Sequence, residues 1–184
     1  MAEDSTGHSD PPDQALIASW RGGDERAATV LVARHAGALA RYVTSLGERE
    51  AVEEVVQDTF VRAFSSLDSF RGESSLRTWL FTIARRLVVD RRRAARRRRD
   101  VHTLGEADAA SEFTALDGLI AEEAEQRVRE AVERLSPTQR EVFLLRVNEG
   151  MAYRDIAEVV GTTEGAARVH YHNALRTVKE SLYV

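Results

Sequence analysis

Residues 153–182, YRDIAEVVGTTEGAARVHYHNALRTVKESL, have the form of a helix–turn–helix unit. A short helix with one apolar side is predicted for about 153–160, and Gly161 permits a tight turn after it. Thr162 or Thr163 can cap a second helix that runs to Leu182. Because such a helix fits the major groove of duplex DNA, the segment predicts a helical DNA-binding domain.

The outward face of this second helix is basic. Arg168, His172, Arg176 and Lys179 follow one another at steps of four, four and three residues. Arg168 can contact a guanine edge or a phosphate. The alternative is an ordinary three-helix bundle with a solvated basic face.

The rest of the chain from Asp13 onward also shows helical periodicity rather than strand alternation. Ser136 to Gln139 has the pattern of a capping box with proline at the first helical position. We therefore predict an all-α fold of two small helical domains joined by a flexible linker, the C-terminal one a helix–turn–helix. The predicted divisions are a disordered tail at 1–12, a first domain at 13–97, a linker at 98–118 and a second domain at 119–184.

Residues 71–99 hold eleven arginines against Glu73 and Asp90, a local charge of +9. Since the whole chain carries −4, the remaining residues sum to −13, and this split indicates a binding site for a polyanion. Phe70, Trp79 and Phe81 lie beside the charge, which suits unstacked bases. Trp79 belongs to the apolar stripe of its helix. Phe81 lies off that stripe, so it either stacks on a base or packs on a neighbouring helix.

The helix predicted for about 49–66 has one unbroken apolar face and an opposite face with Glu53, Glu54, Gln57 and Asp58. This acidic face is either a solvated surface or a contact for a protein, because carboxylates repel DNA.

Enzyme and metal signatures are absent from the sequence. There is no cysteine, no phosphate-binding glycine loop and no hydrolase or zinc-protease motif. His170 and His172 point about 200° apart on a helix, so they cannot share a metal. No apolar run is long enough to span a bilayer. We expect a cytoplasmic protein that is not an enzyme, with no cofactor, no metal and no membrane insertion.

Four segments resemble the extracytoplasmic-function (ECF) sigma factors, the two-domain group of bacterial transcription initiation factors. They are EEVVQDTFVRAF (53–64), FRGESSLRTWLFTIARRLVVDRRR (70–93), LSPTQREVFLLR (135–146) and YRDIAEVVGTTEGAARVHYHNAL (153–175). Each is weak alone, but their order and spacing together are specific. The resemblance covers residues 13–182 and implies three binding surfaces.

The resemblance implies that the clamp helices of core RNA polymerase contact Glu53, Glu54, Gln57, Asp58 and Arg62. It implies recognition and melting of the −10 promoter element by Phe70, Arg71, Ser74, Ser75, Phe81, Arg85, Arg86 and Arg93. It implies −35 binding by Tyr153, Arg154, Thr163, Glu164, Gly165, Arg168, His172 and Arg176. The linker would run near the active-site channel of the polymerase, and an anti-sigma factor would be a further partner.

Two departures from the family pattern concern DNA recognition. Ala84-Arg85-Arg86 stands where the family often has Ala-Arg-Asn, and the predicted recognition helix is less basic than usual.

Two other functions stay open at this point: a helix–turn–helix regulator that binds duplex DNA alone, and an interaction protein whose helical domains sequester a partner.

Overall fold

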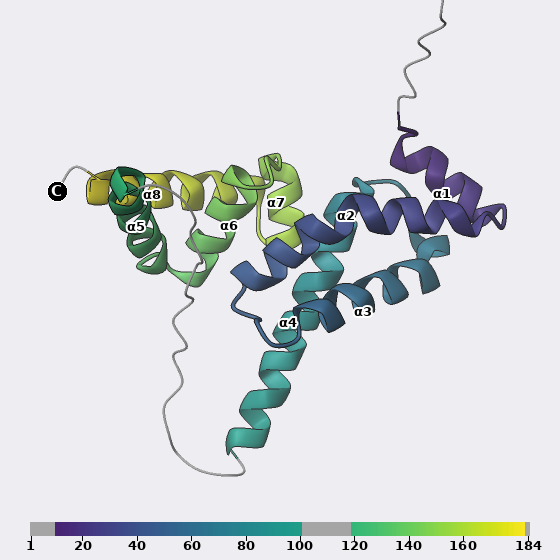
Figure 1. Ribbon diagram of the computed structural model, residues 1–184, viewed down its shortest axis with the longest axis horizontal. Helices are drawn as coiled ribbons and strands as arrows, with labels where there is room; N and C mark the ends of the chain where they lie inside the picture. The colour runs from purple at the N-terminus through teal and green to yellow at the C-terminus, as the bar shows by residue number, and fades with distance from the viewer. Residues whose placement is uncertain (1–9, 101–118, 183–184) are drawn as a thin grey trace, which may run out of the picture. The chain divides into compact units, whose positions relative to one another are not determined.

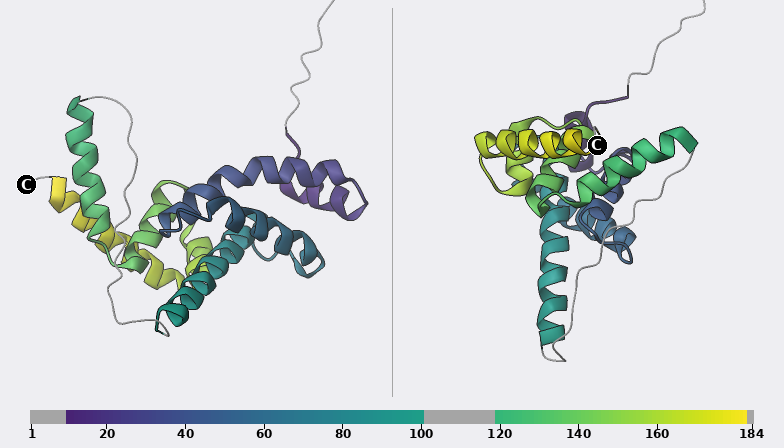
Figure 2. Two further views of the ribbon diagram at one scale, coloured as in Figure 1. Left: turned by 60° about the horizontal axis from the view of Figure 1, so that its bottom comes forward. Right: turned by 90° about the vertical axis from the view of Figure 1, so that its left-hand side faces the viewer.

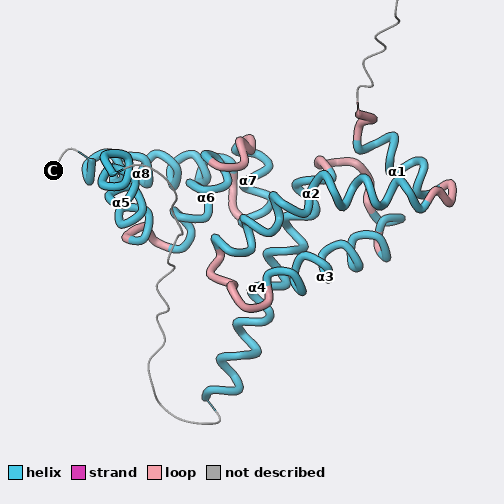
Figure 3. Tube along the Cα trace, in the orientation of Figure 1, coloured by secondary structure: helices cyan, strands magenta, loops and turns pink. Residues whose placement is uncertain are grey.

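The computed structural model describes residues 10–100 and 119–182 (Figure 1). The elements are α1 (Asp13–Arg21), α2 (Glu25–Ser45), α3 (Val52–Ser65), the short 3-10 turn η1 (Leu67–Ser69), α4 (Leu76–Asp100), α5 (Leu119–Glu133), α6 (Pro137–Val147), α7 (Tyr153–Val160) and α8 (Glu164–Leu182). Every described element is a helix, and loops connect them (Figure 3). The all-α prediction is confirmed. Most of the predicted tail and linker lies outside the described residues.

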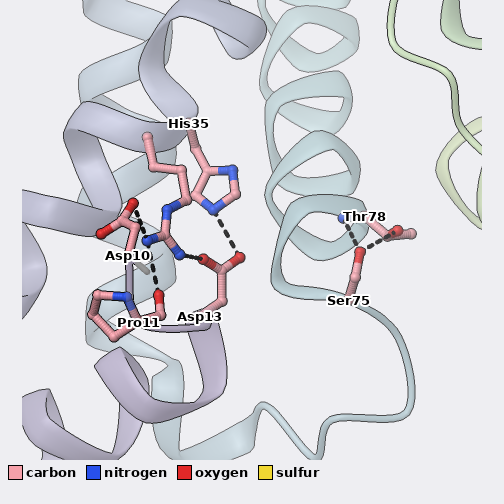
Figure 4. A network of polar contacts seen from close by, with 7 residues as sticks. Asp10, Pro11, Asp13, His35, Ser75 and Thr78 are labelled. Atoms are coloured by element: carbon pink, nitrogen blue, oxygen red, sulfur yellow. Dashed lines mark hydrogen bonds and ion pairs between the residues drawn. The ribbon is translucent and has the colours of Figure 1, made fainter. Parts of the chain in front are cut away.

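The described residues fall into two compact units, which divide within α2 after Gly37. In the first unit, α2 holds the start of α1 through a carboxylate. Asp13 accepts a hydrogen bond from Arg34 Nη1 at 2.5 Å, and its other oxygen lies 2.8 Å from His35 Nε2 (Figure 4). Arg34 also donates to the carbonyl oxygen of Pro11 at 2.8 Å. These contacts fix α1 against α2, because the His35 side chain is buried.

In the second unit, α3 and α4 pack together along their apolar faces. The predicted stripe of α3 is confirmed, since Val55, Thr59, Phe60 and Ala63 are buried. The buried residues of α4 include Leu80, Ala84, Leu87 and Val88, at the predicted helical spacing. Ser75 caps α4: its hydroxyl accepts a hydrogen bond from the amide of Thr78 at 3.0 Å (Figure 4).

The helix α4 extends beyond the predicted first domain. It continues as one helix to Asp100, past the domain boundary predicted at 97 (Figure 2). The arginine run therefore forms helical turns, on which Arg92, Arg93 and the arginines at 96–98 are exposed. Arginine and alanine favour helix, and positive charge near a helix C-terminus is stabilised by the helix dipole.

Helices α5, α6 and α8 pack around a small core formed by Ala131, Leu135, Phe143, Ala174 and Val178. The capping box at Ser136 is confirmed, because its hydroxyl accepts from the amide of residue 139 and the Gln139 side chain accepts from the Ser136 amide. Gly161 has φ +76°, the left-handed conformation that glycine adopts at low cost, and it ends α7 as predicted. Within this unit α7 packs on α6, α8 and α4.

Candidate nucleic-acid and polymerase interface

The polar face of α3 is open to solvent. Glu53, Glu54, Gln57 and Arg62 are exposed, and Asp58 is half-buried. Glu54 is exposed and also paired, since Arg91 Nη1 lies 3.0 Å from its Oε1. Val61 lies on the same face and is 57% exposed. Acids around an exposed valine suit a protein partner better than a nucleic acid.

The loop before α4 carries an aromatic pair. The rings of Phe70 and Trp79 lie 5.0 Å apart between centroids, tilted by 35°. Both side chains are half-buried, while Arg71 is exposed and Ser74 is half-buried. The Ser75 hydroxyl is occupied by the cap, because it also shares a 2.8 Å hydrogen bond with the Thr78 hydroxyl. The loop therefore presents aromatic edges and Arg71 rather than the hydroxyl of Ser75.

Phe81 lies in the core. Of its two predicted roles, packing on a neighbouring helix is confirmed, and exposure for base stacking is wrong. Its side chain is 0% exposed, and its ring stacks on Tyr42 at 4.8 Å between centroids. The guanidinium of Arg77 lies over the ring, 5.4 Å from its centroid. The buried arc of α4 is wider than the predicted stripe, because α2 supplies Tyr42 and Thr78 is buried as well.

Two buried carboxylates bind the basic side of α4. Glu141 of α6 accepts a hydrogen bond from Arg85 Nε at 2.8 Å and one from the Tyr42 hydroxyl at 2.6 Å. Glu149, which follows α6, pairs with Arg77 and with Arg41, whose Nε lies 3.3 Å from its Oε1. Arg86 and Arg93 stay exposed, as a DNA contact requires.

These contacts change the ionisation of the buried groups. Burial raises the pKa of Tyr42 well above its ordinary value, and the charge and hydrogen bond of Glu141 raise it further. Burial alone would lower the pKa of Arg85, but the hydrogen bond and charge of Glu141 outweigh it and raise that pKa. Arg85 is therefore a permanent cation that faces a carboxylate.

The helix–turn–helix places most of its predicted DNA contacts on one exposed surface. Thr163 caps α8 by accepting from the amide of Ala166 at 3.2 Å. The exposed residues of α8 in the predicted set are Glu164, Gly165, Arg168, His172 and Arg176.

At the start of α7, Tyr153 is half-buried and Arg154 is exposed. Arg154 donates a 3.2 Å hydrogen bond to the carbonyl oxygen of Glu73. The structure thus brings the exposed residues of α8 together with Tyr153. Arg154 instead binds the backbone of Glu73, within the protein.

Two residues of this surface were not predicted. Val169, 58% exposed, and Asn173 line an open hollow of about 450 Å³ together with Tyr153, Arg168 and His172. Both could have been predicted from their spacing in the sequence, because positions 165, 168, 169, 172 and 173 share one face of a helix. An exposed valine can contact a thymine methyl group, and an asparagine amide can pair with adenine.

No cluster of three potential metal ligands occurs among the described residues. Likewise, none of the described helices is both long enough and apolar enough to cross a membrane.

Comparisons with known proteins find matches to both halves of the chain. The family model "Sigma-70 region 2" matches residues 31–98, and "Sigma-70, region 4" matches residues 125–178. The ECF RNA polymerase sigma-E factor of Escherichia coli (strain K12) is 30% identical over 175 residues, which cover 90% of this chain and 92% of that protein. The chain belongs to the ECF sigma factor family.

Further ECF sigma factors show the same relationship. The sigma-E factor of Haemophilus influenzae (strain ATCC 51907 / DSM 11121 / KW20 / Rd) is 29% identical over 179 residues, covering 92% of this chain and 95% of that protein.

Two solved structures are also similar. CnrH in complex with the cytosolic domain of CnrY matches with a TM-score of 0.66 and 31% identity, over 92% of this chain and 96% of that one. The sigma factor RpoE in complex with the anti-sigma factor NepR from Bartonella quintana matches with a TM-score of 0.64 and 28% identity, over 85% and 96%.

Proposed function

We propose that this chain directs core RNA polymerase to promoters with two recognition elements and opens the DNA there. Three separate surfaces on one chain carry this proposal: the acidic face of α3, the basic α4 with its aromatic loop, and the helix–turn–helix. A regulator that only binds duplex DNA needs the third surface alone. A protein that only sequesters a partner needs neither the arginine-rich helix nor the recognition helix.

The polymerase contact is assigned to Glu53, Glu54, Gln57, Asp58 and Arg62. Their support is that they share one face of a well-packed helix, on which four of them are exposed and Asp58 is half-buried. The exposed Val61 adds apolar area to this contact. The first domain, 13–97, would thus bind polymerase on α3 and DNA on α4.

The −10 element is assigned to the loop and the exposed arginines of α4. Arg71, Arg86 and Arg93 are available to phosphates, and the pair of Phe70 and Trp79 offers ring edges to an unstacked base. Ser74 lies beside them, whereas Ser75 acts by capping α4. Phe81 takes no direct part, because it is fully buried.

The −35 element is assigned to the second domain, 119–184. The start of α8, with its cap Thr163 and with Glu164, Gly165 and Arg168, would enter the major groove. His172 and Arg176 continue the same exposed face and would contact phosphates. The linker at 98–118 would pass near the polymerase channel.

The chain is proposed to catalyse nothing itself and to act in the cytoplasm, where polymerase works. We also propose an anti-sigma factor as a partner. Its support is that the structurally similar RpoE is bound to the anti-sigma factor NepR.

Transcription with purified components tests the proposal. The protein and core polymerase are incubated with a panel of promoters, and run-off transcript and strand opening are measured. We expect transcript from a subset of promoters only. Absence of core binding and of transcript from every promoter would overturn the proposal, and DNA binding without core binding would instead favour a duplex-binding regulator.

Two variants separate the surfaces. Replacing Gln57 and Glu53 by alanine should weaken core binding while leaving binding to an isolated −35 duplex unchanged. Glu25→Gln, an exposed acid at the start of α2, is the matched control and should change neither.

A further inference from the structure

The ring of Tyr153 carries two arginines. The guanidinium carbons of Arg146 and Arg168 each lie 4.9 Å from the ring centroid. At this distance a guanidinium is attracted to the electron-rich face of an aromatic ring. Tyr153 belongs to α7, Arg146 to α6 and Arg168 to α8, so the ring joins three helices.

The ring itself is held firmly by the core. Its edge meets Tyr171 with centroids 5.8 Å apart and planes at 62°. Tyr171 in turn stacks on the buried Phe143 at 6.0 Å. Arg146 is also fixed, because its Nη1 donates to the carbonyl oxygen of Met151 at 2.7 Å. Tyr153 is therefore a rigid platform rather than a mobile surface side chain.

Arg168 is the exposed partner in this arrangement. Its side chain is 61% exposed, and its Nη2 also pairs with Glu164, one turn earlier on α8. A free arginine side chain loses about 2 kcal/mol of rotamer entropy when it is fixed. Stacking occupies only the flat face of the guanidinium. Its five N–H donors lie in the plane, and those that do not bind Glu164 stay available.

We propose that Tyr153 is a positioning residue for Arg168, which it holds extended for hydrogen bonding to a base edge of the −35 element. This inference rests on the proposed −35 role of α8. It assigns the role to the aromatic ring and not to the phenolic hydroxyl. Tyr153 therefore acts on sequence recognition through Arg168 rather than by a DNA contact of its own, and the ligand is the planar acceptor edge of a guanine.

The test is a base-preference measurement on holoenzyme assembled from the full chain and core polymerase. Each base is placed at each −35 position, and open-complex formation is measured. Arg168→Ala identifies the position that Arg168 recognises, because preference is lost there. Tyr153→Leu should reduce preference at that same position by about fivefold, the equivalent of about 1 kcal/mol.

Two further variants make the result decisive. Tyr153→Phe keeps the ring and should keep the wild-type preference. Tyr153→Leu combined with Arg168→Ala should show no further loss at that position beyond Arg168→Ala alone. Should thermal unfolding show that the leucine variant is not folded, Tyr153→Met replaces it as a flexible side chain without a ring.

Several outcomes would overturn the inference. An equal loss on all promoters in Tyr153→Leu would mean a structural role only. A loss in Tyr153→Phe as large as that in the leucine variant would assign the role to the hydroxyl. Unchanged base preference in Arg168→Ala would remove the residue that Tyr153 is said to position. In each case wild-type holoenzyme still transcribes, whereas failure of the proposed function would abolish wild-type transcription itself.

Discussion

Replacing Phe81 by alanine tests whether this ring belongs to the core or to the DNA interface. Full burial of a phenylalanine is worth about 1.5–3 kcal/mol, and its stacking on Tyr42 adds about 0.5–1.5 kcal/mol. These two contributions sum to about 2–4.5 kcal/mol, and the cavity left by the substitution adds to them. The expected loss in the free energy of unfolding is about 4 kcal/mol, within the usual range for removing a buried aromatic ring. This is a large part of the stability of an ordinary domain.

Urea unfolding followed by tryptophan fluorescence measures this loss. The sequence contains two tryptophans, Trp20 and Trp79, and both precede the helix–turn–helix, so the signal reports on the N-terminal half. With a denaturant slope of about 2 kcal/mol per M, the midpoint should fall by about 2 M.

Matched variants complete the experiment. Phe81→Leu keeps most of the apolar volume and loses the ring stacking, so its loss should be about 1 kcal/mol. Val61→Ala, at an exposed position on α3, should change the free energy by less than about 0.5 kcal/mol. A wild-type midpoint in Phe81→Ala, together with a loss of strand opening, would refute the assignment to the core.

Three further outcomes follow from individual contacts. Ser136→Ala removes the hydrogen bond that the Ser136 hydroxyl accepts from the Gln139 amide and should cost about 1 kcal/mol, measured as lower hydrogen-exchange protection in α6. Because the pKa of Tyr42 is raised in the folded chain, the stability it contributes is fully present below about pH 10, its unfolded pKa, and is lost as the pH rises through the folded pKa. Tyr42→Phe should remove this alkaline loss from unfolding curves recorded between pH 8 and 11. Glu149→Gln leaves Arg77 and Arg41 facing a neutral amide; since both are partly exposed, the cost should be about 1–2 kcal/mol, seen as faster hydrogen exchange in α7, while the exposed Glu158→Gln should have no effect.

Local signals predicted the parts of the fold that depend on neighbouring residues. The stripe of α3, the capping box at Ser136 and the turn at Gly161 are each set within a few residues of sequence, and all are confirmed. The burial of Phe81 depends instead on Tyr42, which lies on another helix. Periodicity within α4 cannot show that a second helix covers its flank.

The ion pairs between arginines of α4 and the two buried glutamates could not be predicted from the sequence for the same reason. Arg85 and Glu141 are 56 residues apart, and Arg77 and Glu149 are 72 apart. Counting charges along the chain gives the local charge of +9 at residues 71–99, but it does not show which of these arginines already pair with carboxylates of the protein. The exposed set of α8 was predictable because its residues share one helix, whereas the contact of Arg168 with Tyr153 joins two.

The extension of α4 to Asp100 makes the arginine run a charged rod. At about 1.5 Å per residue, the six arginines among residues 91–98 give about one positive charge per 2 Å of helix axis. Duplex DNA carries about one negative charge per 1.7 Å, so the two linear charge densities nearly match with opposite sign. Without a polyanion, arginines four residues apart, such as Arg92 and Arg96, repel each other along the helix. The end of α4 therefore behaves as a polyelectrolyte, whose helical length grows when salt or a nucleic acid supplies counterions.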